Sequence, residues 1–180
     1  MSNCVVVYES VYGDTRAIAE AVAEGFGGAE VVPVHEAHSA AGSPQLLIVG
    51  GPTHIHALSR PRTLQAAVDA AGKHGTAVEP GAMSEPGLRR WLQELPDCHG
   101  VCAAAFDTRL AGVPALTGSA AQGIARRLHR RGYEVIGTDS FVVKGSEGPL
   151  ADGELERARA WGARLAQILS ARLATQATAA

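Results

Sequence analysis

The chain has 180 residues and a formal net charge of −2, with 16 Lys and Arg against 18 Asp and Glu. This length suits one domain of roughly 150 residues with short additions. The near balance of charge argues against a protein that binds nucleic acid by neutralising phosphates. The three cysteines, Cys4, Cys98 and Cys102, are too few and odd in number for a disulfide framework, so they predict reduced thiols. Without a signal peptide or an apolar segment of membrane-spanning length, we expect a cytoplasmic protein that does not contact membranes.

The first strand is predicted over the apolar run Cys4–Tyr8, which is rich in β-branched residues. A helix ending at a glycine is predicted over 17–25. The turn between them, 9–16, carries hydroxyl groups at Ser10 and Thr15. A helix that starts in this way presents unpaired N–H groups and the positive end of its dipole, which suits a phosphate group. An ordinary capped turn is the alternative, because neither the nucleotide-triphosphate loop nor the dinucleotide fingerprint is present.

Strands and helices then alternate along the rest of the chain. Later strands are predicted at 30–34, 46–50, 100–106 and 133–143, the last interrupted near Gly137, and later helices at 63–71, 86–95, 119–131 and 152–173. Short apolar strands joined by helical crossovers predict an α/β fold with a doubly wound, five-stranded parallel sheet and helices on both faces. We expect a single domain over 1–173 and a disordered tail at 174–180. The loops 50–61 and 107–114 follow the third and fourth strands at the edge of the sheet that carries function in such folds.

Three segments resemble those of the flavodoxin family. Ser10-Val11-Tyr12-Gly13-Asp14-Thr15 resembles its phosphate loop, Gly51–His54 its first flavin-flanking loop, and Phe106–Arg109 its second. With the matching order of elements, the resemblance extends from Cys4 to about Leu169. It implies strand order 2-1-3-4-5, with FMN at the switch point between the first and third strands.

The resemblance also implies which residues bind the cofactor. The hydroxyl groups of Ser10 and Thr15 and the backbone N–H groups of 11–15 would bind the FMN phosphate. The remaining residues of this loop are Val11, Tyr12, Gly13 and Asp14. One side of the flavin ring would be lined by Pro52, Thr53, His54 and Ile55, and the other by Phe106, Asp107, Thr108 and Arg109.

Some residues depart from the family pattern or have a simpler explanation. Tyr12 replaces the usual middle threonine, and Asp14 stands where asparagine is common, so we expect its carboxylate to point toward solvent. His54 and His56 could form half of a metal site, but no other ligand is suitably spaced, and we predict neither a metal site nor a catalytic residue. Asp107 and Arg109 could instead form a surface ion pair. We interpret Trp91 and Trp161 as packing residues and the arginines of 126–131 as a solvated helix face.

The resemblance implies an FMN-binding electron-transfer protein, a flavoprotein in which the cofactor supplies the redox chemistry. We prefer an electron carrier to a turnover enzyme. The first alternative is an FMN-dependent NAD(P)H:quinone-type oxidoreductase on the same fold, and the second is a binding module that has lost its flavin. The expected partner is a redox protein or a small-molecule electron acceptor, and the protein would be a monomer or a homodimer.

Overall fold

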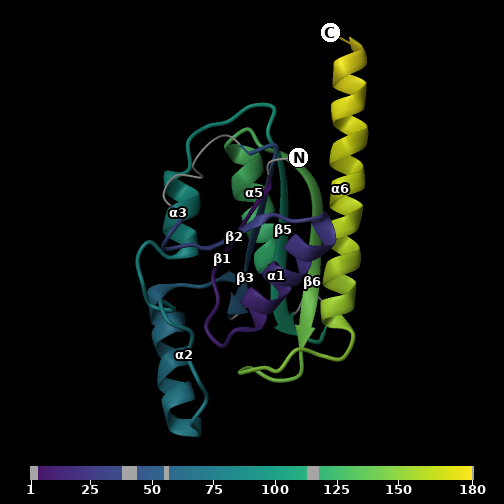
Figure 1. The fold of residues 1–180 in the computed structure, drawn as a ribbon. Coiled ribbons are helices and arrows are strands. Elements are labelled where there is room, and N and C mark those ends of the chain that lie inside the picture. The colour runs from purple at the N-terminus through teal and green to yellow at the C-terminus, as the bar shows by residue number, and fades with distance from the viewer. Residues whose placement is uncertain (1–3, 38–43, 55–56, 113–117, 180) are drawn as a thin grey trace.

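The computed structural model describes residues 4–37, 44–54, 57–112 and 118–179 as a sheet between two layers of helices (Figure 1). The strands are β1 (Cys4–Tyr8), β2 (Glu30–Pro33), β3 (Leu46–His54), β4 (Ala57–Leu58), β5 (Cys102–Leu110) and β6 (Glu134–Val143). The helices are α1 (Asp14–Phe26), α2 (Pro61–His74), α3 (Leu88–Glu94), α5 (Ala120–Arg130) and α6 (Glu154–Ala179).

The five long strands are parallel and lie in the order β2-β1-β3-β5-β6. This order confirms the doubly wound sheet predicted from the sequence. The short strand β4 is an addition, because it folds back and pairs antiparallel with Thr53 and His54 at the end of β3. Strand β3 therefore runs four residues beyond Gly50, into a segment predicted to be a loop: Gly51 and Pro52 pair with β5, and Thr53 and His54 pair with β4.

Side chains alternate between the two faces of the sheet, as expected for strands buried on both sides. In β1, Cys4 and Val6 pack toward α1 and α6, whereas Val5 and Val7 pack toward α3 and α5. The α6 side also contains a cluster of edge-to-face rings with centroids 6.1–6.2 Å apart. Its members are Phe106, Phe141 and Trp161, and both tryptophans of the chain are buried, which confirms that they are packing residues.

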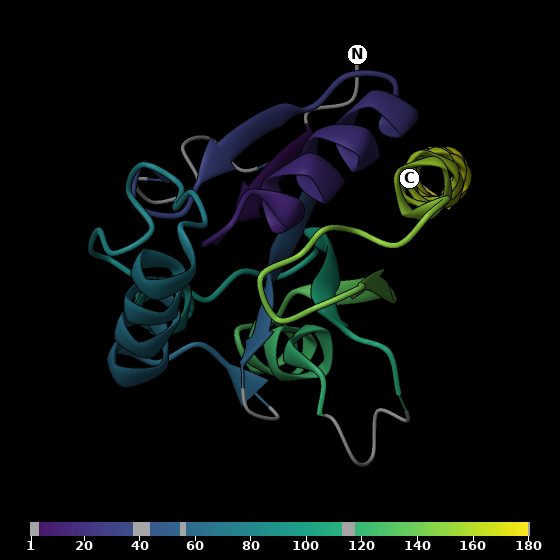
Figure 2. The same cartoon turned by 90° about the horizontal axis from the view of Figure 1, so that it is seen from below.

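Helices α1 and α6 lie side by side (Figures 1 and 2) and approach each other through two glycines. A Cβ atom added to Gly25 would overlap the Arg159 carbonyl, and one added to Gly162 would overlap the Val22 carbonyl. The backbones of α1 and α6 are therefore in direct contact at this crossing. Gly25 does not end α1 as predicted, because the helix continues to Phe26 and stops at Gly27, whose φ of 99° suits a left-handed cap.

Other boundaries also differ from the predicted ones. Strand β5 runs past Phe106 to Leu110 because it pairs with β6 as far as Val143. Strand β6 is continuous, and a register shift opposite Ala103 and Ala104 accommodates the predicted interruption near Gly137. Helix α6 does not end near Leu173 but continues to Ala179, in place of the disordered tail expected there.

The outer edge of β6 is capped by side chains and by the chain that follows it. The N–H of Ser140 donates to Asp139 Oδ1 (2.8 Å), and the N–H of Val142 donates to Glu154 Oε2 (2.8 Å). The Ala151 N–H donates to the Val142 carbonyl (2.8 Å), and Arg157 donates to the Ser140 carbonyl. The outward backbone groups at this end of the edge strand therefore have partners within the chain.

All three cysteines are free, as expected from their number. Cys4 and Cys102 are buried, and burial raises the pKa of the Cys4 thiol to about 12. Cys4 is therefore a packing residue rather than a reactive thiol. Among the described helices, none combines the length and the apolar character needed to cross a membrane.

Candidate cofactor site

A cavity of about 240 Å³ opens at the carboxyl ends of β1, β3 and β5, next to the start of α1. Strands β2 and β3 lie on opposite sides of β1, so the cavity occupies the point where the strand order reverses. Its lining residues are Ser10, Val11, Tyr12, Asp14, Thr15, Pro52, Thr53, Thr108, Arg109, Leu110, Val143, Ser146 and Gly148. The volume is below the roughly 300–1,000 Å³ of typical small-molecule sites.

The turn before α1 presents backbone donors to this cavity. Gly13 has a φ of 95°, and its N–H donates to Ser10 Oγ (3.1 Å), which leaves the Ser10 hydroxyl proton free to donate. Ala17 makes the first bond of the helix, to the Gly13 carbonyl (2.9 Å). The N–H groups of 14–16 therefore precede the helical ladder, as in other sites where a helix start binds an anion.

Two hydroxyl groups meet inside the cavity. The Oγ1 atoms of Thr15, in the first turn of α1, and Thr108, in β5, lie 2.8 Å apart and share a hydrogen bond. Both side chains are almost fully buried. Each hydroxyl can donate one proton and accept others, so the pair can reorient toward a bound oxyanion.

Two carboxylates lie close to this helix start. Asp14 does not point into solvent as expected: its Oδ1 accepts a hydrogen bond from the Leu150 N–H (3.2 Å), and burial raises its pKa. Glu79 lies against Gly13 and pairs with Arg16 at 3.2 Å. Both carboxylates have a donor of their own, which reduces their repulsion of an anion in the cavity.

The segment 144–153, which we call the strap, crosses the carboxyl ends of the strands between β6 and α6 (Figure 2). Its residues Ser146 and Gly148 line the cavity. Glu147 attaches it to the chain after α2, since its carboxylate accepts from Thr76 Oγ1 (2.5 Å) and contacts His74 Nδ1 (2.6 Å). These hydrogen bonds lower the pKa of Glu147. The strap therefore covers the cavity and is fastened at its middle.

Asp107 is fully buried beneath the loops and does not line the cavity. Its Oδ2 accepts from the hydroxyls of Thr53 (2.9 Å) and Ser119 (2.8 Å) and from the Ala121 N–H (2.9 Å). Its Oδ1 is buried without a partner among the described residues. The carboxylate therefore fastens the end of β3 to the start of α5. Phe106, also predicted to contact the ring, places its own ring in the core instead.

Arg109 is buried and its guanidinium is bound to the loop that follows β5. It donates to the carbonyl groups of Leu110 (3.4 Å), Gly118 (3.3 Å) and Gly112. Within the described part of the chain it forms no ion pair with Asp107, so the alternative of a surface pair is not realised. The side chain shapes one wall of the cavity by holding this loop in place.

Some of the remaining predicted residues line the cavity, and others lie outside the described part of the chain. Tyr12 lines the cavity, and its hydroxyl donates to the Ala67 carbonyl (2.8 Å), which ties the turn before α1 to α2. Pro52 and Thr53 line the opposite wall. The backbone of His54 belongs to β3, and Ile55 and His56 lie outside the described residues. No cluster of three potential metal ligands occurs in the described part of the chain.

Solved structures with a similar fold are numerous, and three of them, each under 25% identical to the chain, illustrate the likeness. An archaeal flavodoxin superposes with a TM-score of 0.59 at 16% identity, covering 93% of this chain and 99% of its own. A WrbA-like flavodoxin from Agrobacterium tumefaciens gives 0.58 at 23% identity, covering 94% and 98%. A short-chain flavodoxin associated with a bacterial microcompartment gives 0.62 at 12% identity, covering 94% and 99%. The chain has the flavodoxin fold. No family model matches it, and no curated protein matches its sequence.

Within the flavodoxin fold, nine of the predicted site residues line one cavity, namely Ser10, Val11, Tyr12, Asp14, Thr15, Pro52, Thr53, Thr108 and Arg109. Sequence reasoning missed four lining residues, Leu110, Val143, Ser146 and Gly148. The sequence did contain a signal for Ser146 and Gly148. The strap follows the last strand, so it must begin at the carboxyl edge of the parallel sheet, where the cavity lies.

A second buried carboxylate of this flavodoxin-fold chain, Glu9, lies at the end of β1 but does not line the cavity. Its Oε1 accepts from the Ser59 hydroxyl and its Oε2 from the Leu88 N–H (2.8 Å). Burial raises the pKa of Glu9 from its ordinary value of 4.5 to about 7, and Arg89 opposes this shift while Glu85 adds to it. The Glu9 side chain therefore links the end of β1 to Ser59 and to the start of α3, and its burial disfavours the ionised form.

We expect the stability of the protein to fall between pH 5 and pH 7 through Glu9. Below about pH 4.5 the carboxyl is protonated in both states, whereas at higher pH the unfolded chain releases the proton and the folded one retains it. A shift of this size predicts a loss of roughly 2 kcal/mol over that interval. Urea denaturation of the wild type and of Glu9→Gln, an uncharged side chain of the same shape, measures the effect. Parallel pH profiles for the two proteins would contradict it.

Proposed function

We propose that the protein binds FMN and transfers electrons. The observation that carries this proposal is the cavity at the strand-order reversal, where the first turn of α1 and the Thr15–Thr108 hydroxyl pair face one space. FMN, when bound, supplies the redox chemistry, and the protein supplies binding, orientation and electrostatics. The likeness of the fold to flavodoxins supports the proposal.

The phosphate would be bound by neutral donors. The N–H groups of 14–16, the hydroxyls of Ser10 and Thr15, and the positive end of the α1 dipole all favour an anion at this point. Of the nearby cations, Arg16 is paired with Glu79, whereas the guanidinium of Arg109 is held by carbonyl groups and keeps a positive charge beside the cavity. We add Ser146 of the strap to the phosphate-binding candidates, since it lines the same cavity.

The flavin ring would extend from the cavity past the carboxyl ends of β3 and β5, because the cavity itself is small. Pro52 and Thr53 supply one wall, and Thr108, Arg109 and Leu110 supply the other. Asp107 positions Thr53 through its hydrogen bond, and Phe106 supports β5 from the core, so both act indirectly. His54 and Ile55 complete the proposed ring contacts.

Titration of the purified protein, stripped of any bound flavin, with FMN tests the proposal. We expect quenching of flavin fluorescence at a one-to-one ratio and much weaker binding of riboflavin, which lacks the phosphate. A protein that leaves the fluorescence of both flavins unchanged would overturn the proposal. That result would favour the alternative of a flavodoxin-fold binding module without flavin.

An FMN-dependent NAD(P)H:quinone-type oxidoreductase is the second candidate. It is favoured by one observation: Tyr12 is the single aromatic residue that lines the described cavity, so no aromatic wall closes the ring site to a substrate. Rapid two-electron reduction by NAD(P)H with turnover of a quinone would support the enzyme. Stepwise one-electron reduction without such turnover would support the carrier.

The strap should slow the exit of FMN. Thr76→Val removes the hydroxyl that donates to Glu147 while keeping the shape of the side chain. Losing one hydrogen bond of this kind predicts FMN dissociation about three- to tenfold faster, measured by stopped-flow dilution of the complex. Thr175→Val, in the exposed end of α6, is the matched control. Equal dissociation rates for both variants and the wild type would contradict a closing role for the strap.

A further inference from the structure

The cationic side chains are paired on one side of the sheet and largely unpaired on the other. Eight of the 16 Lys and Arg residues form ion pairs, namely Arg16, Arg90, Arg131, Lys144, Arg157, Arg159, Arg164 and Arg172. Five of these are on α1 and α6. The net charge of −2 therefore conceals a basic region on the opposite layer of helices.

Five arginines make up this region, which we call the arginine stripe: Arg60, Arg89, Arg126, Arg127 and Arg130. Within the described part of the chain none of them forms an ion pair. Arg89 donates to the carbonyls of Leu58 (2.8 Å) and Ser59 (3.2 Å), and Arg127 donates to that of Gly123 (2.9 Å), but carbonyl groups leave the positive charge uncompensated.

The members of the stripe are close enough to repel one another. Burial and the charges of Arg89, Arg130 and Arg126 lower the pKa of Arg127. Burial and the charge of Arg60 lower the pKa of Arg89, and the nearby carboxyl of Glu9 opposes that shift. The stripe thus runs from the last turn of α5 across α3 to the residue that precedes α2. A fold that keeps neighbouring cations of the stripe close together gains from a partner that supplies negative charge.

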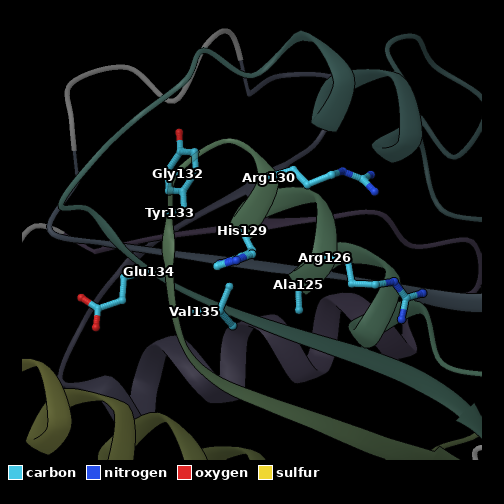
Figure 3. Close-up of a pocket in the computed structure, with 8 residues that line it drawn as sticks. All are labelled: Ala125, Arg126, His129, Arg130, Gly132, Tyr133, Glu134 and Val135. Atoms are coloured by element: carbon cyan, nitrogen blue, oxygen red, sulfur yellow. The ribbon is translucent and has the colours of Figure 1, made fainter.

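Two hollows flank the stripe on either side of α5. One of about 800 Å³ lies between α5 and the start of β6, and its lining includes Arg126, His129 and Arg130 (Figure 3). Figure 3 shows the side chains of Arg126 and Arg130 extending to the same side of α5, away from Glu134. A second hollow of about 340 Å³, between α3 and α5, is lined by Arg127, Arg130 and Arg131. The arginine stripe therefore borders two recesses in the protein surface.

We propose that the arginine stripe is a docking site for a protein with an acidic surface. Projecting carboxylates of such a partner would enter the hollows and pair with the guanidinium groups, which bind carboxylates in a fixed fork geometry. Arg60 follows β4, which pairs with the end of β3, so a docked partner would reach the loop beside the proposed ring site. That last point rests on the proposed function, and the docking itself does not.

Nucleic acid fits this surface less well. Glu134 lines the larger hollow and Asp97 the smaller one, so carboxylates interrupt the positive surface that a continuous phosphate backbone would follow. Binding of single strands also relies on exposed aromatic side chains, and Tyr133, the aromatic residue of the larger hollow, is buried.

The test measures binding of a fluorescein-labelled deca-glutamate peptide by anisotropy, with deca-lysine and a ten-nucleotide oligo-dT as comparison probes. We expect the glutamate peptide to bind at low salt and to be released near 1 M salt, where the Debye length falls to about 3 Å. Arg126→Glu with Arg130→Glu should weaken binding about tenfold or more. Arg159→Glu with Arg164→Glu makes the same change in net charge on α6 and should leave binding within about twofold.

Circular dichroism checks that the variants are folded, and Arg126→Gln with Arg130→Gln gives a milder change in the same direction. Equal losses in the stripe and α6 variants, tighter binding of oligo-dT or deca-lysine, or no binding of the glutamate peptide would each overturn the docking site. Peptide binding by a protein that ignores FMN would sustain the docking site and overturn the proposed function. FMN binding without peptide binding would sustain the proposed function and overturn the docking site.

Discussion

Replacing Gly162 by alanine is expected to lower the free energy of unfolding by about 3 kcal/mol, the upper part of the usual range for overpacking. The new Cβ would overlap the Val22 carbonyl and lie 3.0 Å from the Phe26 backbone nitrogen. Backbone atoms inside α1 cannot move aside as a side chain can, so α6 must shift away from α1. The apolar contacts of Trp161 and Leu165, which flank this crossing in the core, would loosen with it.

Gly72→Ala is the matched control for this substitution. Gly72 also lies within a helix, α2, but an added Cβ there would have no neighbour within 4 Å. Alanine should stabilise that helix by up to about 1 kcal/mol. Thermal unfolding measures both, and a 3 kcal/mol loss in a chain of this size corresponds to a melting temperature lower by roughly 6–12 °C. A Gly162→Ala protein as stable as the wild type would show that α1 and α6 do not pack this closely.

Thr15→Ala is expected to weaken FMN binding by about 1.5–3 kcal/mol, the usual value for a hydrogen bond to a charged group. The hydroxyl is almost fully buried, and its removal also leaves Thr108 without its 2.8 Å partner. The lost donor faces the cavity beside the first-turn N–H groups of α1. The corresponding fall in affinity is roughly 10- to 150-fold.

Two comparisons make this result specific to the phosphate. Thr15→Ser keeps the hydroxyl and should retain most of the affinity for FMN. Riboflavin lacks the phosphate, so its weaker binding should be nearly the same in the wild type and in Thr15→Ala. An equal loss of affinity for both flavins would place the phosphate elsewhere and make Thr15 a purely structural residue.

The architecture followed from the sequence because its signals are local. The run Cys4–Tyr8 and its counterparts in β3 and β5 are apolar on both faces, which requires a covered parallel sheet. The helix predicted at 119–131 is present as α5, and Ser119 caps it, with its hydroxyl accepting from the Gln122 N–H (3.2 Å). The ends of the elements were less predictable, since the extension of β3 depends on pairing with β5 and β4, and that of β5 depends on pairing with β6.

The site was predictable to the extent that it lies on the strand ends. Chain order alone brings Ser10, Thr15, Pro52 and Thr108 to the same edge of the sheet. The directions of the Phe106 and Asp107 side chains could not be predicted in this way, because β5 continues through both residues. Phe106 enters the core, whereas Asp107 caps α5. The fastening of the strap by Glu147 depends on a contact with residues some 70 positions away, which no local pattern encodes.

The capped border of β6 limits how copies of this molecule can associate. At the opposite border, β2 is only four residues long and ends in Pro33, which has no N–H to offer. The capped end of β6 and the short strand β2 are therefore poorly suited to recruiting a strand from another chain into a continuous intermolecular sheet. Addition of foreign strands at these two segments should be disfavoured even in concentrated preparations.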